Sequence, residues 1–212
     1  MKFSKARICG LIVVLFYTVG FFGLSSDMLV ELFKDLVPFH LLLMFLLIMI
    51  SHDNKNRAFY TFVVVTYIAG FLIELAGVKT GYIFGDYTYG ATLGYKIADI
   101  PLIIGINWVL MVYSTGAILE NLRIKSRVIL ALLGAGLLSI VDILIEPVAV
   151  KYDYWSWANA EIPFHNTVGW FFFSIFMMSV FYMLRFEKNN PVGSILFIIQ
   201  ALFFLALNIT II

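Results

Sequence analysis

Two acidic residues inside an otherwise apolar run are the first feature of the sequence that could do chemistry. Asp142 and Glu146 lie four positions apart between Val128 and Val150, so they share one face of a helix with their Cβ atoms about 6 Å apart. Two buried carboxyl groups this close cannot both ionise without a large free-energy cost. We therefore expect one protonated acid beside one anionic partner, which is the arrangement that acid–base catalysis uses.

Pro147 follows this pair directly. A proline inside a helix removes one backbone hydrogen bond, which leaves the carbonyl group of Ile143 free to hold a water or a substrate hydroxyl. The competing interpretation is structural: the two carboxyl groups could bond to Asn107 or to tyrosines and so hold neighbouring membrane helices together.

Other polar residues are predicted to lie at a similar depth. Asp142 lies about 12 Å below the end of its helix and Asn107 about 9 Å below the start of its own, at 1.5 Å per residue. With Glu74, His40 and His165 they would form one pocket that opens outward. A histidine–carboxylate metal site is a weaker interpretation, because no HExxH or ExxH motif occurs, and we expect no metal. Diphosphate chemistry with Mg²⁺ is disfavoured, because residues 142–146 contain one aspartate.

Aromatic residues are frequent in and around the same outer half. They are Tyr82, Tyr87, Tyr89, Trp108, Trp155, Trp157 and Trp170. An interfacial aromatic belt is the alternative explanation for Trp155 and Trp157. Trp108 lies too deep for a belt, and its ring could instead face a developing carbocation.

The elements that position these residues are membrane helices. Of the 212 residues 62% are hydrophobic and 13% are charged, whereas about 25% of residues are charged in a typical soluble domain. The single cysteine, Cys9, excludes a disulfide framework, and a net charge of +1 gives no reason to propose nucleic acid as a partner. The expected partner is the lipid bilayer and what dissolves in it.

Uncharged runs long enough to cross a bilayer predict an all-α polytopic membrane protein with seven transmembrane helices in a single domain, residues 1–212. A signal peptide is the alternative for the first run, but no small-x-small cleavage site follows Gly23. The runs are Ile8 to Leu24, Leu36 to Ile50, Phe59 to Ala76, Ile100 to Leu119, Val128 to Val150, Thr167 to Leu184 and Val192 to Ile212.

The basic residues predict the orientation, because cytoplasmic loops are enriched in lysine and arginine. Ten of the fourteen fall on one side: Lys2, Lys5, Arg7, Lys55, Arg57, Arg123, Lys125, Arg127, Arg185 and Lys188. The other four are Lys34, Lys79, Lys96 and Lys151. We expect a cytoplasmic N-terminus, an external C-terminus and a place in a bacterial or archaeal cytoplasmic membrane.

Prolines suggest internal order. Proline suits the first turn of a helix, and four of the five prolines are predicted there, at Pro38, Pro101, Pro163 and Pro191. A tryptophan follows seven residues after both Pro101 and Pro163. These echoes suggest three diverged helical hairpins plus a closing helix, although membrane helices share such start signals without any repeat.

One segment resembles a known family. The run from Gly81 to Gly90, GYIFGDYTYG, is followed by Leu93-Gly94, Ile100-Pro101-Leu102 and Gly105-Ile106-Asn107-Trp108. It is similar to the membrane carotenoid biosynthesis family that contains the gamma-carotene 1'-hydratases and bisanhydrobacterioruberin hydratases. Residues 142–147, Tyr154-Trp155, Asn166 and Gly169-Trp170 extend the resemblance, which covers about Glu74 to Trp170.

The resemblance implies carotenoid biosynthesis by addition of water across the terminal C1=C2 double bond of an acyclic carotenoid. Such hydration needs an acid that protonates carbon, shelter for a tertiary cation and a held water, and it needs no cofactor. The implied partners are a carotenoid dissolved in the membrane and other enzymes of its pathway.

We assign the catalytic roles to Asp142, Glu146, Glu74 and Asp86, with the choice between Asp142 and Glu146 as the acid left open. The residues expected to bind the substrate are Asn107, Trp108, Tyr82, Tyr87, Tyr89, Trp170 and His165. The alternatives are an end-group cyclase or isomerase that uses the same acid, and a non-catalytic protein that binds or transports carotenoid or lipid.

Overall fold

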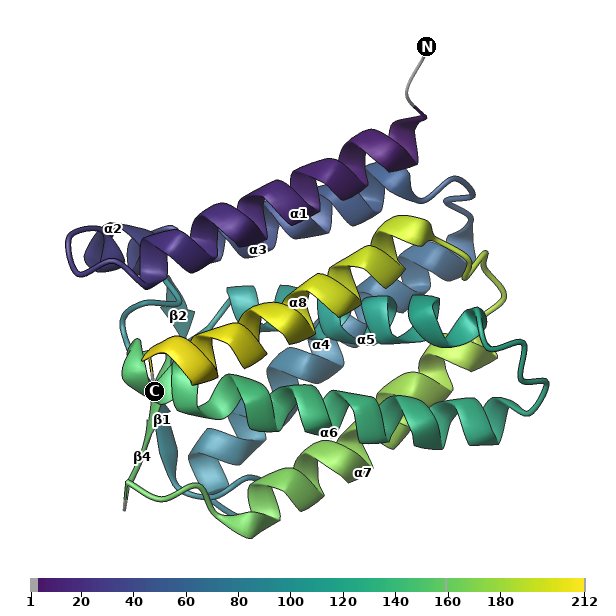
Figure 1. Cartoon of the computed structure of the whole chain (residues 1–212). Coiled ribbons are helices and arrows are strands. Elements are labelled where there is room, and N and C mark those ends of the chain that lie inside the picture. The colour runs from purple at the N-terminus through teal and green to yellow at the C-terminus, as the bar shows by residue number, and fades with distance from the viewer. Residues whose placement is uncertain (1–3, 159, 212) are drawn as a thin grey trace.

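The computed structural model describes residues 4–158 and 160–211 (Figure 1). Within that part the chain forms eight helices: α1 (Lys5–Leu24), α2 (Val30–Asp35), α3 (Val37–Ser51), α4 (Arg57–Thr80), α5 (Ile103–Glu120), α6 (Arg127–Lys151), α7 (Phe164–Met183) and α8 (Pro191–Ile211). Four short strands form two antiparallel pairs, β1 (Tyr87–Tyr89) with β4 (Trp155–Trp157) and β2 (Lys96–Ile97) with β3 (Ile100–Pro101).

Each of the seven predicted apolar runs overlaps a helix, although Ile100 to Leu102 precede α5 and Ile212 lies outside the described residues. Among the described residues, six helices are long and apolar enough to cross a membrane: α1, α4, α5, α6, α7 and α8. They indicate an integral membrane protein and confirm the all-α class. The remaining apolar helix, α3, has 15 residues and is about 22 Å long, which is less than the roughly 30 Å of a hydrocarbon core. A seventh crossing therefore stays a prediction.

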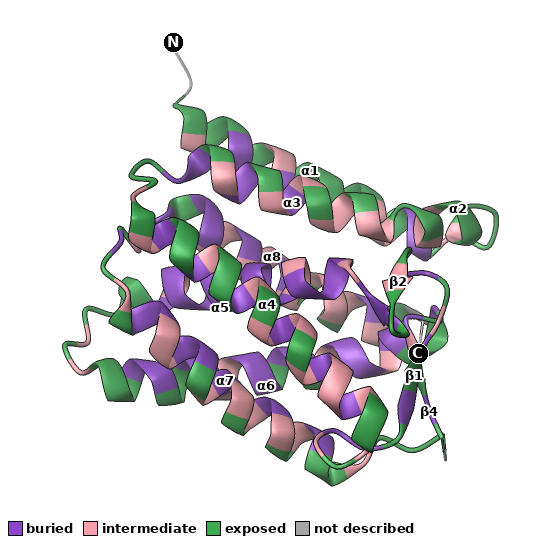
Figure 2. Ribbon diagram, turned by 180° about the vertical axis from the view of Figure 1, so that it is seen from behind, coloured by how far each residue is buried: buried purple, intermediate pink, exposed green. Residues whose placement is uncertain are grey.

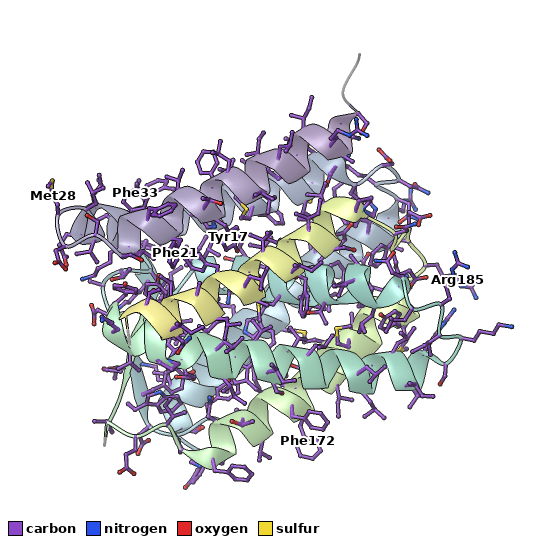
Figure 3. All side chains as sticks on the ribbon, in the orientation of Figure 1. Tyr17, Phe21, Met28, Phe33, Phe172 and Arg185 are labelled. Carbon is purple, nitrogen blue, oxygen red and sulfur yellow. The ribbon has the colours of Figure 1, made fainter. Side chains whose placement is uncertain are left out.

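Helix α5 is the centre of the packing. Of its 18 residues 78% are buried. A helix that is apolar all round suits such a central position. The other long helices have exposed residues along their outer faces (Figure 2). Large apolar side chains are among them, including Leu11, Leu202 and Phe172, of which Phe172 is labelled in Figure 3. An exposed apolar surface of this extent fits contact with lipid.

The basic residues are separated between the two ends of the molecule. The start of α1 and the connections α3–α4, α5–α6 and α7–α8 lie at one end (Figure 1), and Arg185 is labelled there in Figure 3. An ion pair of 2.7 Å between Lys5 Nζ and Asp53 Oδ1 joins two of these segments. Lys2 lies outside the described residues.

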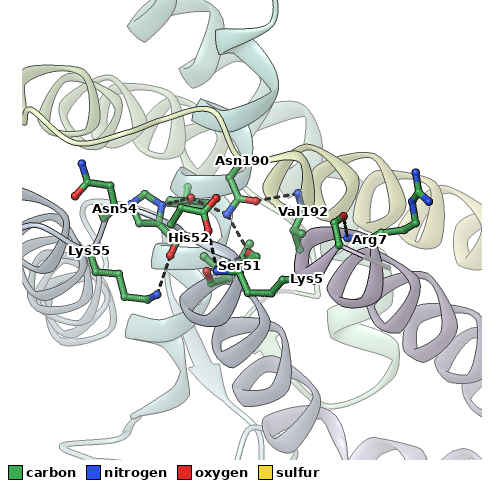
Figure 4. A network of polar contacts seen from close by, with 12 residues as sticks. Lys5, Arg7, Ser51, His52, Asn54, Lys55, Asn190 and Val192 are labelled. Atoms are coloured by element: carbon green, nitrogen blue, oxygen red, sulfur yellow. Dashed lines mark hydrogen bonds and ion pairs between the residues drawn. The ribbon is translucent and has the colours of Figure 1, made fainter. Parts of the chain in front are cut away.

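A buried hydrogen-bond network closes the same end (Figure 4). His52 Nε2 lies 3.0 Å from the backbone oxygen of Asn54, and His52 Nδ1 lies 2.8 Å from the hydroxyl of Tyr113. Since the Asn54 oxygen can only accept, Nε2 donates to it, and in the neutral imidazole Tyr113 donates to Nδ1. Asn190 Nδ2 then donates to Tyr113 and to Ser51 Oγ, each at 3.0 Å. The network ties α3, α5 and the start of α8 together.

The separation of basic residues leads to a topology prediction. A reporter fused after Arg57 or after Lys125 is expected to be cytoplasmic, and one fused after Lys151 is expected to be external, because positive charge is retained inside. Paired phosphatase and fluorescent-protein fusions measure this. The reverse pattern would contradict the predicted orientation.

The first-turn positions of the prolines are correct in two cases and wrong in two. Pro38 lies in the first turn of α3, and Pro191 is the first residue of α8. Pro101 lies in β3, and Pro163 is the extended N-cap of α7 with φ −73° and ψ 140°. The fixed φ of proline is compatible with extended backbone as well as with a helix start, so the sequence pattern could not distinguish them. The three-hairpin repeat stays a prediction.

Candidate functional site

The pairing of β1 with β4 brings four aromatic residues together near the C-terminal ends of α4 and α6. Tyr87 is opposite Trp157, and Tyr89 is opposite Trp155. Side chains alternate along a strand, so Thr88 points to solvent while Tyr87 and Tyr89 are buried. The four rings therefore share one face and cover the ends of the helices that carry the carboxyl groups.

Glu74 on α4 is buried and accepts three hydrogen bonds. The hydroxyls of Tyr87 and Tyr89 lie 2.5 and 2.8 Å from Oε2, and Trp108 Nε1 lies 3.0 Å from Oε1. Gly70, one turn before Glu74, makes the last contact possible, because a Cβ there would lie 2.6 Å from the Trp108 side chain. Every donor points at one carboxyl group, which favours its anionic form.

The two tyrosines act as fixed donors. Burial, reinforced by the nearby Glu74 carboxylate, raises the pKa of the Tyr87 phenol far above its usual value. The same causes, in the same order, raise the pKa of Tyr89. Both phenols therefore keep their protons at any physiological pH and continue to donate to Glu74.

Glu146 on α6 also accepts three hydrogen bonds, from donors on β4 and α7. Trp155 Nε1 and Trp157 Nε1 each lie 3.0 Å from Oε2, and Asn166 Nδ2 lies 2.9 Å from Oε1. The strand β4 supplies two of these donors and α7 supplies the third. Three donors again favour a carboxylate.

Asp142, one turn before Glu146, has a different environment. It is 1% exposed, and its Oδ2 accepts one hydrogen bond of 3.2 Å from Asn166 Nδ2. Its Oδ1 is buried and finds no hydrogen-bond partner among the described residues. An ionised carboxylate in such a place would be costly, whereas a protonated carboxyl group needs fewer donors.

A small cavity of about 30 Å³ lies between these groups, which is room for about two water molecules. Both glutamates reach it, together with Asn107 and the aromatic residues of the two strands. It is lined by Glu74, Phe84, Tyr87, Tyr89, Ile104, Asn107, Glu146, Trp155, Trp157, Asn166 and Trp170. We call this the carboxylate cavity.

Several residues expected in the site lie elsewhere. Tyr82 is 90% exposed, and Asp86 and His165 are also at the surface. The backbone turns at Gly81 and Gly85, with φ of 68° and 117°, direct this part of the loop outward.

Trp108 and Trp170 stack, with ring centroids 4.3 Å apart and planes at 19°. It is Trp170 that lines the cavity, and Trp108 lies behind it with its indole nitrogen on Glu74. Trp108 is thus placed to orient a carboxylate.

Three hydrogen-bond donors of the site were not among the residues assigned to it from the sequence: Asn166, Trp155 and Trp157. Asn166 precedes Trp170 by one helical turn and so shares its face, which is a signal that could have identified it. Trp155 and Trp157 have the alternating spacing of a strand, but their pairing with β1 is a long-range contact that no local pattern specifies.

The described residues contain no group of three or more histidine, cysteine, aspartate or glutamate side chains that could hold a metal ion. The polar atoms of the site are instead arranged around the two glutamates, in the pairs and triplets given above. What this arrangement offers chemically is two carboxyl groups held by three donors each, a third buried carboxyl group beside them and space for water.

The chain was compared with known proteins. Residues 31–212 match the family described as carotenoid biosynthesis protein. A bisanhydrobacterioruberin hydratase of Haloarcula japonica is 30% identical to the chain over 105 residues, which cover 46% of the chain and 36% of that protein. The chain therefore matches about a third of the length of this curated relative. No solved structure matches significantly. Since the family match extends over most of the sequence, the chain belongs to the carotenoid biosynthesis protein family.

Proposed function

We propose that this protein adds water across the terminal C1=C2 double bond of an acyclic carotenoid. The observation that carries the proposal is the carboxylate cavity, where two glutamates with three donors each border a water-sized space beside a carboxyl group with an unpartnered oxygen. Family membership and the similarity to a hydratase support the substrate class and the reaction.

Glu146 is the carboxyl group that meets the substrate, because it lines the cavity and Asp142 does not. Asp142 holds the proton in the resting protein, since its oxygens have a single donor between them in the part of the chain that the structure describes. The amide of Asn166 donates to both carboxyl groups and so holds them beside each other on one helix face. In the proposed mechanism Asp142 passes its proton to Glu146 directly or through a water, and the amide serves to position the pair. Three donors then stabilise the carboxylate that remains after Glu146 has given up a proton.

The reaction is balanced without a cofactor. Glu146 gives its proton to C2, the electrons of the C1=C2 π bond form the new C2–H bond, and C1 becomes a tertiary cation. A water held by Asn107 forms the C1–O bond and returns one proton to Glu146. The product is a tertiary alcohol, and the protein ends in its starting state.

Stabilisation of the cation comes from Glu74 and from the rings around it. Glu74 accepts hydrogen bonds from Tyr87, Tyr89 and Trp108, so as an anion it is already oriented and need not reorganise when positive charge develops. The aromatic residues that line the cavity add the attraction of ring faces for a cation. Trp108 acts here through Glu74, as a positioning residue.

Expression in a bacterial host that accumulates lycopene tests the proposal. We expect pigments whose mass has increased by one or two waters, measured by liquid chromatography with mass spectrometry. A Glu120→Gln variant is the matched control, because Glu120 is an exposed glutamate at the C-terminal end of α5, and it is expected to give the same products. Pigment of unchanged mass with a shifted spectrum would show that the reaction is cyclisation or isomerisation and not hydration. Unchanged pigment would contradict enzymatic hydration of lycopene.

A further inference from the structure

A second and larger cavity lies between α1, α3 and α8, and we call it the apolar groove. Its volume is about 370 Å³, which is within the usual range for small-molecule sites. Aromatic residues form much of its wall: Tyr17 packs edge-on against Phe203, with ring centroids 5.2 Å apart, and Phe33 borders the groove from α2. Figure 3 shows Tyr17 directed from α1 toward α8.

The apolar groove adjoins the carboxylate cavity. Ile104, Asn107 and Trp155 line both of them. A molecule that lies in the groove can therefore place one end beside Asn107 and Glu146 while the rest stays in apolar surroundings. This change from apolar to polar walls gives a bound molecule a direction.

The groove also borders the surface that fits contact with lipid. Four of its lining residues, Phe16, Val19, Leu36 and Phe39, are between 42% and 66% exposed. They belong to α1, to α3 and to the residue that precedes α3. A substrate dissolved in the bilayer could pass between these side chains without crossing water.

We propose that the apolar groove holds the hydrocarbon chain of an acyclic polyene that arrives sideways from the lipid, with its terminal double bond directed past Asn107 into the carboxylate cavity. This inference rests on the proposed function and extends it by assigning the access route and the part of the fold that selects a long, flat, acyclic substrate. The groove's continuity with the carboxylate cavity favours a molecule with a reactive end over an ordinary acyl chain, which has nothing to present to Glu146.

Gly20 offers a selective way to block the groove. It lines the groove on α1, and a Cβ added there would meet a single group, Phe203 Cε2, at 3.8 Å, which is ordinary van der Waals contact. Alanine therefore fits, whereas phenylalanine fills space that the polyene needs. Gly136 on α6 is the matched control, because a Cβ there meets nothing within 4 Å and Gly136 does not line either cavity.

The experiment measures lycopene that copurifies with the protein in detergent. We expect wild type and Gly136→Phe to retain lycopene equally, and Gly20→Phe to retain at least about tenfold less, equivalent to about 1.4 kcal/mol. Equal retention by Gly20→Phe, or a wild-type protein that holds phospholipid and no lycopene, would overturn the inference. If retention depends on Gly20 but no hydrated product forms, the groove is supported as the polyene site and the proposed hydration reaction is contradicted.

A second measurement needs no variant. The wild-type protein is labelled with a diazirine analogue of geranylgeraniol, and the adducts are located by mass spectrometry. Adducts on residues 16–20, 39–43 and 200–204 that excess lycopene suppresses support the proposal. Adducts that lycopene does not suppress, or that lie on α7 instead, contradict it even where Gly20→Phe fails to accumulate.

Discussion

Replacing Glu146 by glutamine is expected to lower carotenoid hydration by at least about 100-fold, which is the scale of a lost general acid–base group. The amide cannot give a proton to carbon or take one from water. It also offers one acceptor oxygen in place of two. With its carbonyl oxygen at the position of Oε2, Trp155 and Trp157 keep their acceptor and the Asn166 amide faces an NH₂ group; in the opposite orientation both indole N–H groups lose their acceptor. We therefore expect a second effect, a loss of about 1–3 kcal/mol in the free energy of unfolding.

Pigment conversion per amount of membrane-inserted protein is the measurement for Glu146→Gln, with thermal unfolding in detergent beside it. Glu120→Gln makes the same chemical change at an exposed position and is expected to alter neither quantity. Conversion near the wild-type level in Glu146→Gln would show that this carboxyl group only holds helices together. If Glu146→Gln does not accumulate, Trp157→Phe provides the test, because it removes one donor and keeps the acid.

Much of the site could be predicted because it depends on local rules. The helix repeat places Asp142 and Glu146 on one face, and the direction of the helices brings Glu74 and Asn107 to the same end of the bundle. All of these except Asp142 line the carboxylate cavity, and Asp142 lies one turn from Glu146. Helix geometry alone carries that much information, since residues four apart in a helix have little freedom to separate.

The residues that local rules could not place are those in the loops. Tyr87 and Tyr89 point inward because β1 pairs with β4, a partner about 70 residues away along the chain, whereas Tyr82 and Asp86, a few positions earlier, face outward after a left-handed glycine. The direction of a loop side chain depends on such pairings and on single dihedral angles. The two indole donors to Glu146, Trp155 and Trp157 in β4, could therefore not be placed from the sequence, even though the acid itself was predicted.

The apolar groove likewise combines a part that the sequence predicts with a part that it does not. Its walls come from helices whose apolar character is evident in the sequence, but a cavity is the space that side chains leave unfilled. Gly20 lines that space, and a large side chain at this position would occupy part of it. Hydropathy reports which residues avoid water and says nothing about how completely they fill the interior.

Replacing Asp142 by asparagine is expected to lower hydration by at least about 100-fold as well, but for a different reason and with a different effect on stability. Asparagine keeps the volume of the side chain, and its carbonyl oxygen can still accept from Asn166. Its NH₂ group then takes the place of Oδ1, which has no partner among the described residues, so no hydrogen bond is lost. If the resting Asp142 is the protonated member of the pair, this neutral replacement leaves the free energy of unfolding within about 1 kcal/mol of the wild-type value.

The contrast between the two variants is therefore the sharpest test of the proposed division of roles. Asp142→Asn is expected to unfold at nearly the wild-type temperature and to bind lycopene normally while it fails to convert it. Ser139→Ala, on the same helix and one turn away, removes a hydroxyl that bonds only to its own helix at Ala135, and it controls for general disturbance of α6. A strongly destabilised Asp142→Asn beside a stable Glu146→Gln would reverse the assignment, since it would mean that Asp142 carries the charge and Glu146 the proton. Full conversion by Asp142→Asn would remove Asp142 from the reaction and leave Glu146 to obtain its proton from water in the cavity.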